Sequence, residues 1–376
     1  MALKQEDKAL KADERFVFEL RSLYRSYGYT HYRMSKFEEY DLYVRNKDFL
    51  SSSGIITFTD TNGKLMALKP DVTLSIIKNL SSQTGVQKVF YNENVYRISK
   101  SSGRFREIMQ TGLECVGDIG EYEICETLLL AAKSLEAAGC DFRLDIAHTG
   151  ILTAFMDSLA LTEKKKNELL TCIKRKNTKG IQDICDSLGS DRRVGDAFAS
   201  IIGLYGAPNK ILPELKAICG GSKGDKAVSD LNTVAEFLSC CGYADKINID
   251  FSVINDMNYY NGIVFQGYVS EVPEGVLSGG CYDLLMKKMG RDCGGIGFAI
   301  CLDSLSRLYR DKKEYDYDVI LIYGDASAES VISAVNRLSG EGISVFASRK
   351  MPESAKAGKI LMLTGDGNIK EESSKC

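Results

Sequence analysis

Hydrophobic residues recur at the helical period in some stretches of the chain and alternate with polar residues in others. An apolar stripe predicts a helix over about residues 9–27, and a second stripe predicts one over residues 122–138. Between them, the apolar runs 55–59 and 65–68 flank Asn62-Gly63, which is a strong signal for a β-hairpin. The first part of the chain therefore combines strands with helices.

The middle of the chain predicts strands on either side of a helical segment. Residues 89–96 and 105–116 each predict a strand, and strand signals return at residues 247–251 and 263–265. From about residue 151 to residue 245, the pattern instead indicates short helices separated by polar breaks. Strands joined by hairpins and interrupted by helices favour an antiparallel sheet.

The last part of the chain predicts a small separate unit. A Gly-rich stretch at residues 294–299 is expected to lead into a helix that ends near Leu308, and a charged linker follows. A buried-strand run, a helix and two more strands then predict a parallel α/β unit. We therefore expect an α+β fold with two domains, residues 1–315 with a helical insertion at about 151–245, and residues 316–376.

The composition argues against several classes of function. The 376 residues include 48 Lys and Arg against 51 Asp and Glu, a net charge of −3, which disfavours a dedicated nucleic-acid binder. No apolar run approaches the ~20 residues that span a bilayer. The charged N-terminus lacks an apolar signal core, so we expect a cytoplasmic protein. The 12 cysteines are scattered and only two histidines are present, so we expect no metal centre, disulfide framework or cofactor.

A carboxylate and a hydroxyl stand two residues apart where a strand gives way to a helix. Asp71 and Thr73 together present hydrogen-bond acceptors for an ammonium group. Both residue types are also common in the first turn of a helix, where they cap it. The spacing alone favours this simpler interpretation.

Polar residues share one face of the strand predicted at 105–116. The residues of matching parity are Arg104, Arg106, Gln110 and Glu114. Two arginines, an amide and a carboxylate suit a zwitterionic or anionic ligand. A solvated sheet face with alternating charges explains the pattern equally well.

Tyrosines and glycines form two further candidate motifs. Tyr259 and Tyr260 precede the turn signal Asn261-Gly262, and they either line an aromatic pocket or pack across strands. Gly279-Gly280 either permits close approach of the backbone to a ligand or is merely a loop. None of the four motifs is decisive alone.

Taken together, the order and spacing of these motifs resemble the catalytic core of histidyl-tRNA synthetase and of its paralogue, the regulatory subunit of ATP phosphoribosyltransferase. The resemblance covers about residues 27–309. The matching segments are class II motif 2 at Tyr96-Arg97, 103–106 and 110–114, the two histidine-specific signatures at 258–260 and 279–283, and motif 3 from Gly297. Motif 1 matches weakly at residues 28–38, where Ser35 replaces the motif's proline.

The resemblance implies a six-stranded antiparallel sheet flanked by helices, a homodimer formed through residues 29–38, and a pocket for L-histidine. By this resemblance the pocket consists of Asp71, Thr73 and Gln110 around the α-ammonium group, Glu114, Tyr260 and Tyr282 around the imidazole, and Arg97, Arg104 and Tyr259 beside them. The regulatory paralogue shares the aspartate at position 71, where the synthetase has a glutamate.

The chain departs from the synthetase pattern at the positions that handle ATP. Asn255 and Ser304 stand where the synthetase has arginines that contact phosphates, and each such loss typically removes a few kcal/mol of transition-state stabilisation. Further replacements at family positions are Ser99, Asn258, Cys281 and Cys301. The tail is shorter than an anticodon-binding domain and lacks a basic stripe, which disfavours tRNA binding.

We therefore expect a non-catalytic regulatory subunit of a short-form ATP phosphoribosyltransferase. Its partner would be a separate catalytic chain in the first step of histidine biosynthesis, and histidine would act on the complex as a feedback effector. Two alternatives remain open at this point. One is a divergent histidyl-tRNA synthetase, and the other is a pseudo-synthetase that acts alone and binds RNA.

Overall fold

The structure is a computed structural model of the chain. It describes residues 11–47, 50, 54–80, 85–99, 102–159, 161–220, 224–254, 257, 259–306, 308, 315–364 and 367–371. These residues form two compact units, one within residues 13–308 and one that contains residues 315–371.

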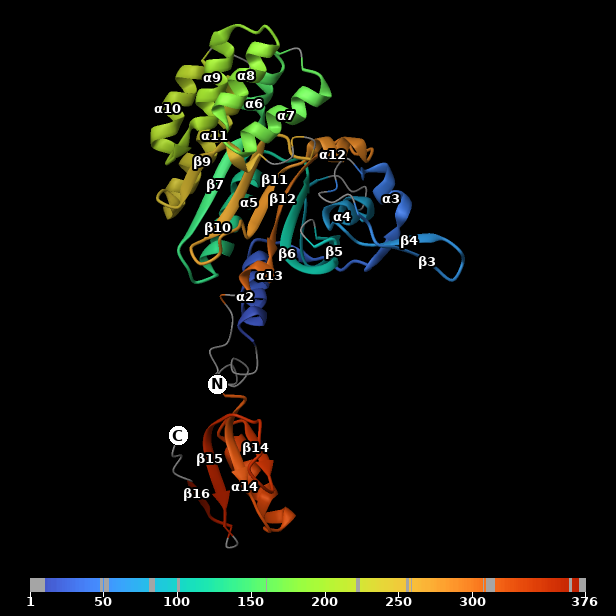
Figure 1. Ribbon diagram of the computed structural model, residues 1–376, viewed down its shortest axis with the longest axis vertical. Coiled ribbons are helices and arrows are strands. Elements are labelled where there is room, and N and C mark those ends of the chain that lie inside the picture. The colour runs from blue at the N-terminus through green and yellow to red at the C-terminus, as the bar shows by residue number, and fades with distance from the viewer. Residues whose placement is uncertain are drawn as a thin grey trace. The chain divides into compact units, whose positions relative to one another are not determined.

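A sheet of nine described strands forms the centre of the larger unit (Figure 1). In spatial order the strands are β1 (Thr30–His31), β5 (Gln87–Ile98), β6 (Phe105–Gly117), β12 (Gly294–Cys301), β11 (Leu277–Cys281), β10 (Ile263–Val269), β7 (Phe142–His148), β9 (Ile247–Asp250) and β8 (Tyr205–Gly206). The six strands from β5 to β7 all pair antiparallel. This confirms the predicted six-stranded antiparallel sheet. Strand β1 pairs parallel with β5 at one edge, and at the other end β9 pairs parallel with β7 and β8 pairs antiparallel with β9.

Two of the central strands were not predicted as strands. The Gly-rich stretch at 294–299 belongs to β12 itself, and the helix after it, α13 (Leu302–Leu305), is only one turn long. The Gly279-Gly280 pair, interpreted as a loop or a ligand contact, lies inside β11. Glycine lowers strand propensity, but it is favoured where another group approaches the backbone closely.

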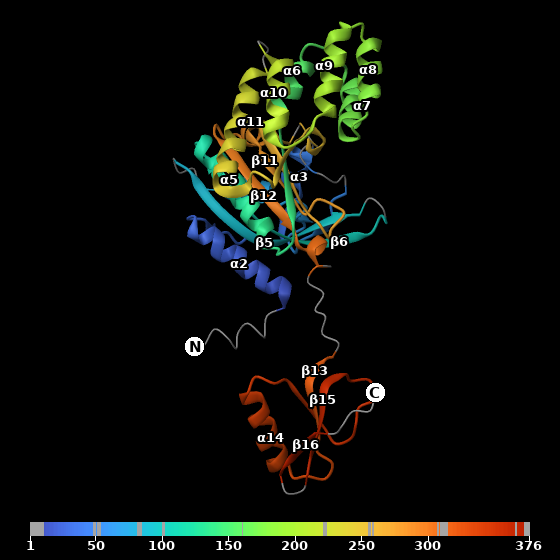
Figure 2. The ribbon, with the colours of Figure 1, turned by 90° about the vertical axis from the view of Figure 1, so that its left-hand side faces the viewer.

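Helices cover both faces of this sheet. On one face lie α2 (Ala12–Ser26) and α5 (Glu121–Glu136), which Figure 2 shows beside β5. The hydroxyls of Tyr24 on α2 and Ser134 on α5 are 3.0 Å apart, and the Tyr24 ring contacts Phe90 and Phe298 of the sheet. The other face packs against α3 (Tyr40–Arg45), α4 (Thr73–Asn79) and α12 (Asp283–Lys288), whose buried side chains share one core cluster with those of β5.

A helical segment separates β7 from β9 in the chain and gathers at one end of the sheet (Figure 1). Its helices are α6 (Thr149–Met156), α7 (Glu163–Lys174), α8 (Thr178–Ser187), α9 (Arg192–Gly203), α10 (Pro208–Cys219) and α11 (Asp225–Leu238), followed by a short π-helical turn, η2 (Ser239–Tyr243). A one-turn helix, η3 (Phe251–Val253), follows β9.

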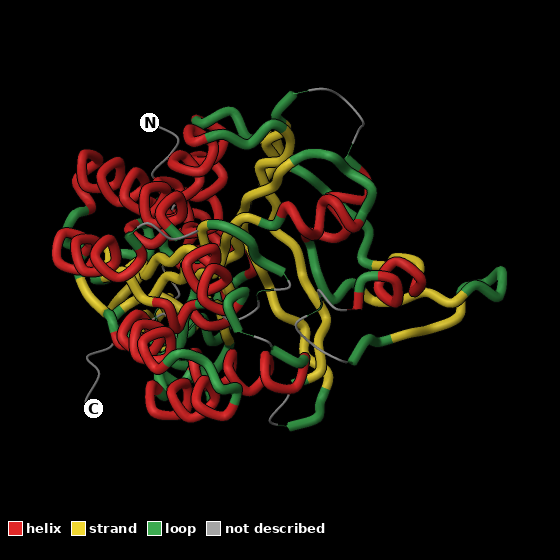
Figure 3. Tube along the Cα trace, turned by 90° about the horizontal axis from the view of Figure 1, so that it is seen from above, coloured by secondary structure: helices red, strands yellow, loops and turns green. Residues whose placement is uncertain are grey.

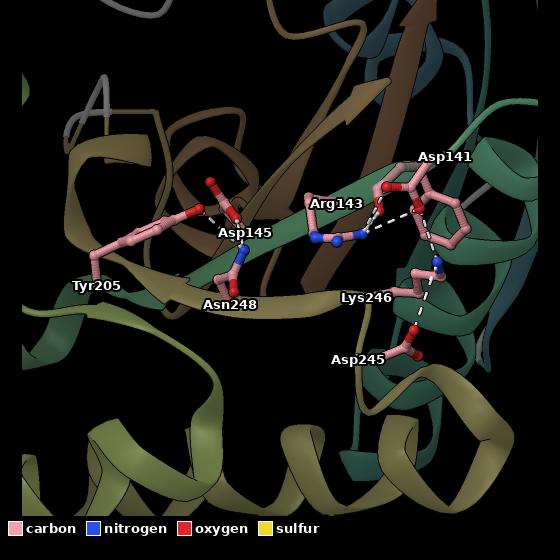
Figure 4. A network of polar contacts seen from close by, with 8 residues as sticks. Asp141, Arg143, Asp145, Tyr205, Asp245, Lys246 and Asn248 are labelled. Atoms are coloured by element: carbon pink, nitrogen blue, oxygen red, sulfur yellow. Dashed lines mark hydrogen bonds and ion pairs between the residues drawn. The ribbon is translucent and has the colours of Figure 1, made fainter. Parts of the chain in front are cut away.

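Polar contacts join the parallel strands β7 and β9, where the chain returns from the helices (Figure 4). Lys246 pairs with Asp141 at 2.8 Å, and Asn248 donates to Asp145 at 3.0 Å and to the Tyr205 hydroxyl at 3.2 Å. Burial raises the pKa of Asp145 to about 6. Side chains thus join β7, β8 and β9 in addition to the backbone ladder.

A small three-stranded sheet projects from the core (Figure 3). It consists of β2 (Phe37–Glu39), β4 (Leu65–Leu68) and β3 (Thr57–Thr59), paired antiparallel, so the hairpin predicted around Asn62-Gly63 is confirmed. The Phe37 and Phe58 rings meet edge to face at 5.3 Å on its surface. We call this element the arm.

The smaller unit contains one helix and four described strands. They are β13 (Tyr317–Ile322), α14 (Ala328–Gly340), β14 (Val345–Ser348), β15 (Ala357–Leu363) and β16 (Ile369–Glu371). Strand β13 lies between β14 and β15 and pairs parallel with both, as predicted, whereas the unpredicted β16 pairs antiparallel with β15. Its core is formed by apolar residues of β13, α14 and β15.

Among the described residues, no helix combines the length and the apolar character needed to cross a membrane. The same residues contain no group of three or more His, Cys, Asp and Glu side chains placed to hold a metal ion.

Candidate functional site

A cavity of about 220 Å³ opens on the face of the sheet next to the start of α4. It is lined by Asp71, Val72, Thr73, Tyr91, Arg97, Gln110, Glu114, Tyr259, Tyr260, Ser278, Tyr282, Gly297, Phe298 and Ala299. These residues come from strands β5, β6, β11 and β12, from the start of α4 and from the loop before β10. Segments far apart in the sequence thus meet around one polar cavity.

Asp71 caps α4 and also faces the cavity. Its Oδ1 accepts a 2.9 Å hydrogen bond from the backbone N–H of Leu74, so the capping interpretation is correct. Its Oδ2 lies 4.0 Å from Nη2 of Arg97, whose Nε donates to the carbonyl of Pro70 at 2.8 Å. Burial raises the pKa of Asp71, and the Arg97 guanidinium opposes this shift. Capping and ligand binding are therefore compatible roles for one side chain.

Glu114 lies at the buried end of the cavity and is only 2% exposed. Its Oε1 accepts a 2.6 Å hydrogen bond from the Thr73 hydroxyl, and its Oε2 accepts one of 2.6 Å from the Tyr282 hydroxyl. Burial raises the pKa of Glu114 to about 8, although the two hydrogen bonds favour the ionised form. Burial therefore favours the neutral form of this carboxyl, and a cationic group beside it would promote ionisation.

Two glycines of β12 make the room that Glu114 and Tyr282 occupy. Gly297 is the register partner of Glu114, and a Cβ atom at Gly297 would collide with Oε2 of that carboxyl. A Cβ atom at Gly295 would collide with the Tyr282 ring. This explains why a strand at the centre of the sheet carries residues of low strand propensity.

Aromatic rings form the apolar wall of the cavity. The Tyr259 and Tyr260 rings meet edge to face at 4.6 Å, and Tyr259 lies 6.3 Å from the Tyr282 ring. Burial raises the pKa of Tyr259, Tyr282 and Tyr91 well above the ordinary value. Their hydroxyls therefore stay protonated, and the Tyr282 hydroxyl donates to Glu114.

The structure brings eight of the nine predicted site residues to this cavity. They are Asp71, Thr73, Arg97, Gln110, Glu114, Tyr259, Tyr260 and Tyr282. The ninth, Arg104, is exposed just before β6 begins and does not line the cavity. Strand β12 pairs with β6 only from Gln110 onward, so the end of β6 near Arg104 and Arg106 lies beyond the edge of the cavity.

Sequence reasoning did not select six of the lining residues, which are Val72, Tyr91, Ser278, Gly297, Phe298 and Ala299. Tyr91 has the same parity as Arg97 on β5, so the alternation used for β6 would have placed both on the cavity face. Ser278 stood in a recognised motif but was not selected as a site residue.

Some of the positions that depart from the synthetase pattern can be placed. The Ser304 hydroxyl donates to Glu274 at 3.0 Å, and Cys301 ends β12 as the register partner of Gln110. Cys281 is buried at the end of β11. Asn255 and Asn258 lie outside the described residues.

Comparison with known proteins places the chain in a family. The family model described as histidyl-tRNA synthetase matches residues 6–305. The chain belongs to the histidyl-tRNA synthetase family. Within this family, similar curated relatives are the ATP phosphoribosyltransferase regulatory subunits of Alkaliphilus metalliredigens (27% identity, 84% of this chain and 82% of the relative) and Caldanaerobacter subterraneus (28%, 86% and 86%). This confirms the predicted resemblance to that paralogue.

Several solved structures have a similar fold. An ATP phosphoribosyltransferase regulatory subunit/histidyl-tRNA synthetase from Bacillus halodurans has a TM-score of 0.77 at 22% identity, over 89% of this chain and 88% of that one. A histidyl-tRNA synthetase from Nostoc has a TM-score of 0.72 at 20% identity, over 96% and 93%. A chain of the ATP phosphoribosyl transferase complex from Thermotoga maritima has a TM-score of 0.61 at 20% identity, over 76% and 96%.

Proposed function

We propose that this chain is a non-catalytic regulatory subunit of ATP phosphoribosyltransferase, which a separate catalytic subunit requires for the first step of histidine biosynthesis. The two curated relatives named above are regulatory subunits of that enzyme, and this chain matches each of them over most of its length. The observation that carries the proposal is the polar cavity around Glu114, in a chain whose residues at the family's ATP-handling positions differ from the synthetase pattern.

We propose L-histidine as the ligand of this cavity. Its α-ammonium group would find acceptors on Asp71, Thr73 and Gln110, and Glu114 would accept a hydrogen bond from the imidazole ring. The tyrosine wall would exclude water from the ring and so strengthen these polar contacts. Arg97 carries positive charge at the same cavity, where it would attract the ligand carboxylate.

The alternative of a divergent histidyl-tRNA synthetase is weaker. Amino-acid activation needs positive groups on the phosphates of ATP, and Ser304 is hydrogen-bonded to a carboxylate instead. By the family resemblance, Asn255 marks a second lost arginine. A working synthetase would have arginine at both positions.

The assembly and the domain roles are also proposals. We propose a homodimer through residues 29–38, which then joins the catalytic subunit in a cytoplasmic hetero-oligomer without nucleic acid. We propose that residues 1–315 form the synthetase-like core, with a helical insertion at about 151–245. Residues 316–376 would be a shortened remnant of the anticodon-binding domain, since the described part holds four strands and one helix.

Co-expression tests the partner. The chain is produced with the catalytic subunit of a short-form ATP phosphoribosyltransferase, and the pair is passed over a sizing column. We expect co-elution, and we expect turnover only in fractions that contain both chains. Separate elution, with full activity in the catalytic subunit alone, would contradict the proposal.

A further inference from the structure

Lys69 is a fully buried lysine next to the cavity but not part of its lining. Its side chain is 0% exposed, and its Nζ lies 3.0 Å from Oε2 of Glu93, whose side chain is 16% exposed. Burial lowers the pKa of Lys69, and the hydrogen bond to Glu93 opposes the shift. A buried charge is costly unless it is paired, so this lysine depends on a single carboxylate partner among the described residues.

The Lys69–Glu93 ion pair joins β5, which carries Arg97, to the loop that carries Asp71. Lys69 directly follows β4 of the arm and precedes Pro70 and Asp71. Glu93 lies on β5 with the same parity as Tyr91 and Arg97, which line the cavity. The ion pair thus connects the loop of Asp71 to the cavity face of β5.

Backbone contacts reinforce the same connection. The N–H of Tyr96 donates to the carbonyl of Lys69 at 2.9 Å, and Arg97 donates to the carbonyl of Pro70. On its other side, the N–H of Lys69 donates to the carbonyl of Lys36, immediately before β2 of the arm. Lys69 is therefore the point where the arm, the Asp71 loop and β5 are held together.

We propose that Lys69 and Glu93 are positioning residues, which hold Asp71 in the geometry that binds the ligand's ammonium group. The identity of the ligand in this inference rests on the proposed function. The positioning of Asp71 by the two residues can be measured without any ligand. If the pair is broken, the Asp71 loop keeps only the Arg97 contacts and the Tyr96–Lys69 backbone hydrogen bond to β5, so the position of Asp71 relative to the rest of the cavity is held less firmly. Displacement of the arm would disturb the cavity by the same route.

The same strand supplies a matched control. Lys88 lies on the opposite face of β5 and pairs with Glu126 of α5 at 2.6 Å, with side chains 20% and 3% exposed. Glu126→Gln and Glu93→Gln each remove the carboxylate from a partly buried ion pair between a lysine and a glutamate. Only Glu93 faces the cavity side of the strand.

The test combines histidine affinity with hydrogen exchange, at a temperature where thermal melts show all variants folded. For Glu93→Gln we expect histidine to bind about tenfold more weakly by calorimetry, and the amide of Leu74, which donates to Asp71, to exchange faster. For Glu126→Gln we expect wild-type values of both. The double variant Lys69→Met/Glu93→Met leaves no uncompensated charge and should show the same two effects, which keeps the test open if Glu93→Gln is unstable.

The outcomes separate this inference from the proposed function. Wild-type affinity and wild-type Leu74 exchange in both Glu93 variants would overturn the positioning role, and so would equal losses in Glu126→Gln. If the wild-type chain binds no histidine while Leu74 exchanges faster only in the Glu93 variants, the positioning role stands and the proposed ligand is wrong.

Discussion

The hydroxyl of Tyr282 donates a 2.6 Å hydrogen bond to Oε2 of Glu114, a residue 168 positions earlier in the chain. Thr73 donates to the other oxygen of the same carboxyl group. Three segments of the sequence therefore converge on one buried acid, whose ionisation and ligand contacts can each be measured.

Replacement of Glu114 by glutamine should flatten the pH dependence of stability. Burial raises the pKa of Glu114 to about 8 in the folded chain, whereas the unfolded chain ionises it near ~4.3. Between these values the unfolded state binds fewer protons, so the free energy of unfolding falls as the pH rises from about 4 to about 8. Denaturant unfolding at a series of pH values should show a steeper fall in the wild type than in Glu114→Gln, and parallel profiles would contradict this.

Removal of the Glu114 side chain should weaken histidine binding. A hydrogen bond to a charged group typically contributes about 1.5–3 kcal/mol, so Glu114→Ala should raise the dissociation constant by one to two orders of magnitude. Arg104→Ala is the control, because Arg104 is exposed outside the cavity lining and its loss should leave the affinity unchanged. Calorimetry measures both, and equal affinity in Glu114→Ala and the wild type would place the histidine site elsewhere.

The difference between Glu114 and Arg104 shows how far alternation predicts a site. Parity places both on one face of the β6 region, and Gln110 and Glu114 do line the cavity. Parity carries no information on how far neighbouring strands extend, and β12 ends opposite Gln110. The arginines at 104 and 106 therefore lie where the sheet is narrow, and they are exposed.

The central glycine-rich strands mark the limit of prediction for the fold. Hairpin signals and helical stripes located β3, β4, β5, β6, α2 and α5, because those segments follow local preferences. Strand β12 contradicts its local preference, since Gly297 and Gly295 leave space for Glu114 and for the Tyr282 ring, and in β11 a Cβ atom at Gly280 would collide with the Tyr260 ring. That requirement arises from tertiary packing, which single-sequence patterns do not contain.

The chain should form no aminoacyl-adenylate. Ser304 is hydrogen-bonded to Glu274 and supplies no positive charge for a phosphate, and Asn255 replaces a second family arginine. Pyrophosphate exchange with ATP and histidine should stay at background under conditions where a histidyl-tRNA synthetase is active. Exchange that depends on histidine and is lost in Glu114→Ala would restore the synthetase alternative.

Dimerisation should depend on the segment 29–38. Within it, the Phe37 side chain is 48% exposed on β2, so a charge at this position would disrupt an interface formed there. Light scattering should show a dimer for the wild type and a monomer for Phe37→Glu. Phe18→Glu is the matched control, since Phe18 is 65% exposed on α2 outside the segment. A monomeric wild type at micromolar concentration, or dissociation by both variants, would argue against this interface.

We propose that this chain confers histidine control on a separate catalytic subunit through the cavity of Glu114. The most direct measurement is the turnover of the reconstituted complex as histidine is titrated, with the wild-type chain and with Glu114→Ala. We predict that histidine inhibits the wild-type complex and that the variant complex assembles but needs at least about tenfold more histidine for the same inhibition. Identical inhibition curves for the two complexes would contradict the claim.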